Sequence, residues 1–135
     1  MTFENLPDDW PSMSLADPDL AVDVVDLFLG YRDRLRNSAL LLLCDESGRA
    51  QQPFVISDVD WSAPADERPR MFRLLAGLEI PKVVVAVGSP GGLSTTTALR
   101  WRQTALEELA KVDVELLGFY CADSEGVWQP EPIAA

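Results

Sequence analysis

The sequence predicts a single-domain α/β fold in which helices pack against one mixed β-sheet. Short, continuous apolar runs of strand length alternate with longer segments whose apolar residues recur at helical spacing. A length of 135 residues, with 47% apolar and 24% charged residues, suits one globular domain with one ordinary core. The expected order of elements is α-β-β-α-β-α-β-β, which forms a sandwich of helices around the sheet.

The domain is expected to span residues 17–130, between an N-terminal arm and a short tail. Residues 1–16 are rich in Pro, Asp and Ser and predict an extended arm, with Trp10 as a candidate anchor. Residues 131–135 predict a frayed tail.

The first helix is expected to run from Pro18 to about Arg36, because Asp17 is a favourable N-cap and Pro is favoured at the first helical position. Its core stripe is set by apolar residues at helical spacing, namely Leu20, Val24, Leu27, Phe28, Tyr31 and Leu35. Further apolar residues widen the helix surface beyond that stripe, among them Val22, Val25 and Leu29. We favour a helix buried on two sides within its own domain. The alternative is a helix whose residues 18–36 also cover a partner, most simply in a two-fold homodimer.

The remaining elements follow from apolar runs separated by turn residues. The expected strands are Ala39–Cys44, Pro53–Val59, Lys82–Val87, Val114–Cys121 and a short Gly126–Gln129. The first two form a hairpin in which Gly48 can take a left-handed conformation. The expected helices are Glu67–Leu78, with a core face of Met71, Phe72, Leu74, Leu75 and Leu78, and Thr95–Val112, with Ala98, Trp101, Ala105, Leu109 and Val112.

The charge balance excludes several classes of partner. The net charge is -11, from 11 basic and 22 acidic residues, so nucleic acid and anionic membranes are not expected as partners. No apolar run approaches the ~20 residues that span a bilayer. The N-terminus lacks a basic segment typical of a signal peptide, so we expect a cytoplasmic protein. Cys44 and Cys121 are then expected to be reduced, partly buried thiols.

The chain contains no histidine, which removes most metal and acyl-transfer chemistry. Two cysteines without histidine cannot form a standard zinc site. Serine and cysteine nucleophiles lack a histidine base, and Lys82 and Lys111 do not converge on a serine-rich turn. The acidic loop residues near Asp58 and Asp60 lack the calcium-loop pattern and are expected to be solvated. We therefore expect no enzyme of these classes, no metal and no cofactor.

The stretch VVVAVGSPGGLSTTTALRW, from Val83 to Trp101, predicts a strand, a Pro-Gly-Gly turn and the start of a helix. We favour a structural role in which Ser94 or Thr95 caps the helix. The alternative is a small-ligand or anion site that uses the turn at the helix N-terminus. Its candidate residues are Ser89, Gly91, Gly92, Ser94, Thr95 and Thr97.

Three short motifs carry a resemblance to a known family. They are VVVAVGSPGG at 83–92, RPRMF at 68–72 and DVELLGF at 113–119. Together with the order of elements over residues 39–130, they resemble the JAB/MPN (JAMM) domain family, most closely its RadC-like branch. That family has a strand ending in His-x-His-Pro-Ser-Gly where this chain has Val83 to Gly92.

The resemblance implies a member that has lost its chemistry. In the family, two histidines and an aspartate bind zinc, and a glutamate takes a proton from the metal-bound water. The histidines fall on Val87 and Ser89, the serine of the signature on Thr97 and the aspartate on Arg100. An Asp-His pair of the branch falls on Gly118-Phe119. The resemblance therefore implies a metal-free, non-catalytic JAB/MPN-like domain that serves as a protein-binding or assembly module. The alternative function is the anion-binding protein described above.

Overall fold

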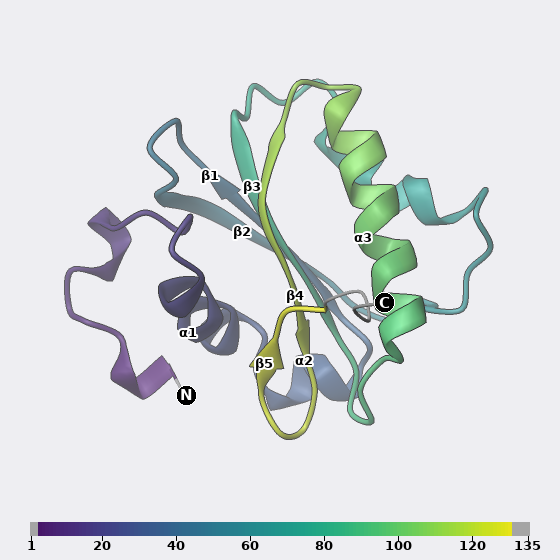
Figure 1. Cartoon of the computed structure of the whole chain (residues 1–135), viewed down its shortest axis with the longest axis horizontal. Coiled ribbons are helices and arrows are strands. Elements are labelled where there is room, and N and C mark those ends of the chain that lie inside the picture. The colour runs from purple at the N-terminus through teal and green to yellow at the C-terminus, as the bar shows by residue number, and fades with distance from the viewer. Residues whose placement is uncertain (1–2, 131–135) are drawn as a thin grey trace, which may run out of the picture.

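The computed structural model describes residues 3–130, so the tail predicted at 131–135 lies outside the described residues. A five-stranded sheet in the order β2-β1-β3-β4-β5 forms the centre of the molecule, and helices cover both of its faces (Figure 1). The elements, with η denoting a 3-10 helix, are η1 (Phe3–Asn5), η2 (Trp10–Ser12), α1 (Pro18–Phe28), α2 (Tyr31–Leu35), β1 (Ala39–Cys44), β2 (Ala50–Ile56), η3 (Arg68–Leu75), β3 (Lys82–Gly88), α3 (Thr95–Ala110), β4 (Glu115–Ala122) and β5 (Val127–Trp128).

The sheet is mixed. β1 pairs antiparallel with both β2 and β3, β3 runs parallel to β4, and β5 pairs antiparallel with β4. A parallel pair needs a long crossover, and α3 supplies it between β3 and β4. These pairings confirm the predicted mixed-sheet α/β fold and its first hairpin, in which Gly48 has a φ of 81°.

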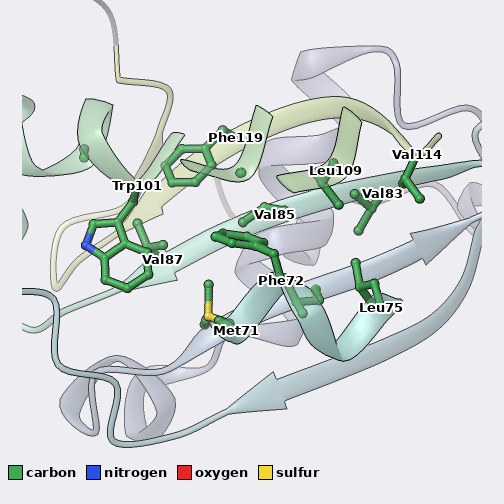
Figure 2. Close-up of a cluster of buried hydrophobic side chains, with 14 of the residues drawn as sticks. Met71, Phe72, Leu75, Val83, Val85, Val87, Trp101, Leu109, Val114 and Phe119 are labelled. Atoms are coloured by element: carbon green, nitrogen blue, oxygen red, sulfur yellow. The ribbon is translucent and has the colours of Figure 1, made fainter. Parts of the chain in front are cut away.

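Each face of the sheet carries its own hydrophobic core. Side chains of β1 alternate between the two, so Leu41 packs under η3 and α3 while Leu40 packs under α1. Figure 2 shows the first of these cores, where Phe72, Trp101 and Phe119 surround the side chains of β3. Burial on both faces explains why the central strands are uninterrupted apolar runs in the sequence.

The predicted first helix is two helices. α1 ends at Phe28, and Gly30 begins α2 with its N–H donating to Asp33 Oδ2 at 3.2 Å. The predicted core stripe assumed one continuous helix, and it is wrong at its C-terminal half. Leu27, Tyr31 and Leu35 are exposed.

The interface predicted on this helix is also wrong. Val25 and Leu29 are 0% exposed and belong to the core between α1 and the sheet, and Val22 is partly buried against the same core. Residues that the structure buries in their own domain cannot form a dimer contact. The homodimer through residues 18–36 therefore stays a prediction, and Val25 and Leu29 cannot belong to its interface.

The N-terminal arm is folded onto the domain rather than extended. It contains η1 and η2, and the Trp10 ring packs edge-on against Phe28 with the ring centroids 6.0 Å apart. Leu15 is buried, and its N–H donates to the carbonyl of Gly48 at 2.8 Å. Trp10 thus acts as the predicted anchor, and the arm completes the core above α1.

Two other predicted elements differ in kind or extent. The predicted helix Glu67–Leu78 is the shorter 3-10 helix η3, which buries Phe72 and Leu75 but leaves Leu74 62% and Leu78 46% exposed. Side chains three residues apart align in a 3-10 helix, so the face that reaches the sheet is narrow. β2 begins at Ala50, three residues before the predicted start, and ends at Ile56.

Smaller differences occur at the ends of the remaining elements. α3 ends at Ala110, which leaves Val112 exposed rather than in the core. No helix among residues 3–130 is long and apolar enough to cross a bilayer.

Candidate functional site

The structure brings together only some of the positions that the predicted resemblance matches with metal ligands. Val87 is buried in the core beside Trp101 (Figure 2). Thr97 and Arg100 lie on the first turns of α3 and line one hollow of about 230 Å³. Ser89 is not among the residues that line this hollow, and its N–H donates to the carbonyl of Ala122 at 2.9 Å.

These residues do not fit zinc. Zinc in proteins is held by thiolate, imidazole or carboxylate groups. The matching positions offer instead the methyl groups of Val87, the hydroxyls of Ser89 and Thr97, and the cationic guanidinium of Arg100. Among residues 3–130, no cluster of three or more His, Cys, Asp or Glu side chains could hold a metal ion. No metal-dependent step can be derived from this donor set.

Gly118 is the position that the predicted resemblance matches with an aspartate, and a Cβ there would be too close to Tyr120. A Cβ at this position would lie 2.7 Å from a ring carbon of Tyr120 and 2.9 Å from its hydroxyl. Tyr120 is fully buried in the core under α1. A side chain at position 118 would therefore require the second core to repack around Tyr120.

The turn from Ser89 to Thr97 caps a helix. Ser94 Oγ accepts a hydrogen bond from the N–H of Thr97 at 3.1 Å, which confirms the predicted cap. Gly92 has a φ of 78°, and a Cβ there would lie 3.2 Å from Asp123 Oδ2. A carboxylate next to the turn disfavours an anion in it.

The six candidate ligand residues of the turn are dispersed. Gly91 is exposed, and Thr95 is the first residue of α3. Thr97 is the one of the six that lines the hollow with Arg68 and Arg100. Its Oγ1 accepts a hydrogen bond from Ser94 Oγ at 3.0 Å, so these two hydroxyl groups belong to the helix cap.

We call the hollow beside α3 the arginine hollow. Its lining residues are Trp61, Ser62, Ala63, Pro64, Arg68, Thr97, Arg100 and Trp101. Two tryptophans hold its wall in place, with ring centroids 5.1 Å apart in an edge-to-face contact. Trp61 Nε1 donates to the carbonyl of Gly88 at 3.0 Å, and Trp101 Nε1 donates to the carbonyl of Trp61 at 2.9 Å. These bonds fix the loop after β2 against β3 and α3.

A second hollow, of about 280 Å³, lies between the edge strand β2 and η3. We call it the β2–η3 groove. It is lined by apolar side chains alone, namely Leu41, Phe54, Val55, Ile56, Leu74, Leu75 and Leu78. Four of these are exposed, from both elements: Phe54, Val55, Leu74 and Leu78.

Sequence reasoning missed both hollows. It assigned Leu74 and Leu78 to the core, and it used Arg68 only as part of a motif. The arginine hollow joins residues from 61 to 101, and the groove joins residues from 41 to 78. Neither set of lining residues has a recognisable pattern in the local sequence, because each set is brought together by the packing of η3 against the rest of the domain.

No protein-family model, curated protein or solved structure matches the chain. The resemblance to JAB/MPN-like domains therefore stays a prediction.

Proposed function

We propose that this chain is a non-catalytic, JAB/MPN-like domain that binds another protein through the β2–η3 groove. The observation that carries the proposal is the set of exposed apolar side chains along this groove. Soluble proteins rarely expose contiguous apolar surface without a use for it, and such patches commonly mark interfaces. The donor set at the family's metal positions supports a binding role rather than hydrolysis.

The position of the groove favours an extended peptide segment as the occupant. β2 pairs with β1 on one side and is an edge strand of the sheet. An edge strand offers backbone N–H and C=O groups to an added strand, while a neighbouring groove takes its alternate side chains. Pro53 lies within β2 and has no N–H to donate, so only a short stretch of pairing can form beside it.

Charge argues for a different protein rather than a second copy in the groove. Each chain carries a net charge of -11, so two copies repel one another at the distances of a dimer contact. A neutral or basic segment with one or two large apolar side chains meets no such repulsion. We therefore assign the groove to such a segment of a partner protein.

Photo-crosslinking in the native host tests this function. A photoreactive residue in place of Phe54, which pairs with Leu41 on the face of the sheet that η3 covers, should give an adduct with a discrete partner. The same residue in place of Leu106 on α3 should not. Leu106 is 42% exposed, similar to Phe54 at 43%, but lies outside the groove.

The purified partner then allows an affinity comparison. The double variant Leu74→Ser, Leu78→Ser should weaken binding at least about tenfold, because burial of each side chain contributes about 1.5–3 kcal/mol. Tyr31→Ser, which alters another exposed apolar residue at 68% exposure, should leave binding unchanged. Equal affinities of the double variant and the unmodified chain, or adducts at both photoreactive positions, would contradict the proposal.

A further inference from the structure

We infer that the arginine hollow binds the phosphate group of a small phosphorylated molecule. The inference is independent of the β2–η3 groove, which lies on β2 and η3 and shares no lining residue with the arginine hollow. It also differs from an anion site in the Ser89–Thr97 turn, because the charge comes from arginine side chains of two elements.

The basic residues of the chain differ in whether they form ion pairs. Six of the 11 basic residues form ion pairs, namely Arg34, Arg36, Arg49, Arg73, Lys82 and Lys111. Arg68 and Arg100 are not among them: within the described part of the chain, neither guanidinium has a carboxylate at ion-pair distance. In a chain with twice as many acidic as basic residues, two unpaired arginines line the same hollow. Arg100 is exposed and Arg68 is partly buried, so both guanidinium groups are accessible to a ligand in the hollow.

Two acidic residues, Asp60 and Glu67, line a neighbouring hollow together with Arg68, not the arginine hollow itself. Within the described residues, neither carboxylate forms an ion pair with Arg68. The Asp60 carboxylate instead accepts hydrogen bonds from the N–H and the hydroxyl of Ser62 at 3.0 and 2.6 Å, which lower its pKa.

Uncharged groups hold the Arg68 side chain in place. Its Nε donates to Thr104 Oγ1 at 3.3 Å, and its Nη1 donates to the carbonyl of Ala63 at 3.0 Å. A guanidinium has five N–H groups, so three remain for a ligand. The side chain is partly buried, and its orientation is set before any ligand arrives.

The guanidinium and hydroxyl donors of the arginine hollow match the charge and the acceptor oxygens of a phosphate group. A phosphate monoester carries about −1.5 to −2 charges near neutral pH and three acceptor oxygens. Two guanidinium groups match that charge, and guanidinium favours bidentate contacts with phosphate oxygens. Thr97 Oγ1 already accepts a hydrogen bond from Ser94 Oγ at 3.0 Å, so its own hydroxyl hydrogen can be donated to a ligand.

The size of the hollow limits how much of the ligand it encloses. A volume of about 230 Å³ is below that of most pockets that enclose a whole drug-sized molecule. The hollow therefore takes the phosphate and the atoms next to it. The rest of the molecule lies over the surface of the 61–64 loop and α3.

NMR titration of the full chain tests the inference, with inorganic phosphate, ribose 5-phosphate and ribose as probes. Ribose 5-phosphate should shift the Nε–H resonance of Arg68 and the amide resonances of Ser62 and Thr97. It should bind more tightly than inorganic phosphate, and ribose should give no shifts. Arg100→Gln should weaken binding at least about tenfold, the range expected for loss of a hydrogen bond to a charged group.

Arg102→Gln is the matched control. Arg102 also lies on α3 and forms no ion pair within the described residues, but it lines a different hollow, so this variant removes the same charge from the same helix. It should leave binding nearly unchanged. Absence of shifts with ribose 5-phosphate, or equal weakening by Arg102→Gln and Arg100→Gln, would overturn the inference. Inorganic phosphate binding as tightly as ribose 5-phosphate would overturn the assignment to a phosphorylated molecule.

Discussion

Asp23 is a buried carboxyl group whose ionised form is unfavourable for the stability of the fold. It lies on α1 at 5% exposure, and its Oδ1 atom is buried without a hydrogen-bond partner among the described residues. Burial raises the pKa of the carboxyl group, and the nearby charges of Asp26 and Asp19 raise it further. The ionised form therefore destabilises the folded state at neutral pH.

Asp23→Asn should stabilise the protein at neutral pH by about 1 kcal/mol or more, because an unsatisfied buried charge is removed. The pKa of Asp23 is higher in the folded state than in the unfolded state. The destabilisation is therefore complete above the folded-state pKa and absent below the unfolded-state pKa. The advantage of Asp23→Asn should accordingly shrink as the pH falls. Urea unfolding at neutral and acidic pH measures this, with the exposed Asp19→Asn as control. A less stable Asp23→Asn at neutral pH would refute the interpretation.

Gly118 allows a second test at a single residue. Gly118→Ala would place a Cβ 2.7 Å from the buried ring of Tyr120 and should destabilise the fold by about 1–3 kcal/mol, as overpacking does. Gly126→Ala is the control, because a Cβ there meets no described atom within 4 Å. The melting temperature of Gly118→Ala should be lower than that of Gly126→Ala. Equal melting temperatures would mean that Tyr120 can move aside with little loss of stability.

At the scale of elements, Arg34 joins three parts of the chain. Its side chain is buried and donates to the carbonyl of Leu29 at 2.8 Å, to the carbonyl of Asp123 at 3.0 Å and to Asp26 Oδ1 at 2.7 Å. These acceptors belong to the end of α1, to the β4–β5 turn and to α1 itself. Arg34 thus fixes α2 at the point where the predicted long helix breaks.

Arg34→Lys should destabilise the fold by about 2 kcal/mol or more, because a lysine cannot reach three acceptors with a planar fork. Arg32→Lys should have no measurable effect, since Arg32 is exposed on the same short helix. Chemical denaturation of both variants provides the measurement. Similar unfolding midpoints would show that the Arg34 bonds contribute little to the joining of α1, α2 and the β4–β5 turn.

The elements that could be predicted from sequence are those whose pattern is set by local contacts. β1, β3 and β4 are buried on both faces, which forces continuous apolar runs, and the caps at Asp17 and Ser94 use short-range hydrogen bonds. The break before Gly30 was not predicted, because the apolar spacing continues across it. The role of Arg34 was not predicted either, since nothing in the local sequence shows that Asp123 supplies an acceptor.

At the scale of the whole molecule, the two cysteines lie in separate cores. Cys44 packs under α1 and Cys121 under α3, on opposite faces of the sheet. Burial raises the pKa of Cys44 to about 11 and that of Cys121 to about 12, and the neighbouring charges of Asp45 and Asp123 act in the same direction. Both thiols are therefore protonated at neutral pH.

The folded protein should show no reaction with a thiol reagent at neutral pH, because the thiolate is the reactive form and both sulfurs are buried. Both cysteines should react in denaturant. Rates measured across a urea series should follow the unfolding transition. Rapid modification of either cysteine without denaturant would mean that the core containing it opens readily.

The central prediction for the whole molecule is that the chain is a metal-free binding domain. The proposed binding surface depends on the packing of β2 against η3, whereas the lack of a zinc site was expected from the absence of histidine. Zinc content after incubation with one equivalent of zinc and extensive dialysis tests the claim most directly. The side chains of Val87, Ser89, Thr97 and Arg100 are not zinc ligands, so we predict a zinc content far below one equivalent and no change in melting temperature. One tightly held zinc per chain, with a raised melting temperature, would contradict the account.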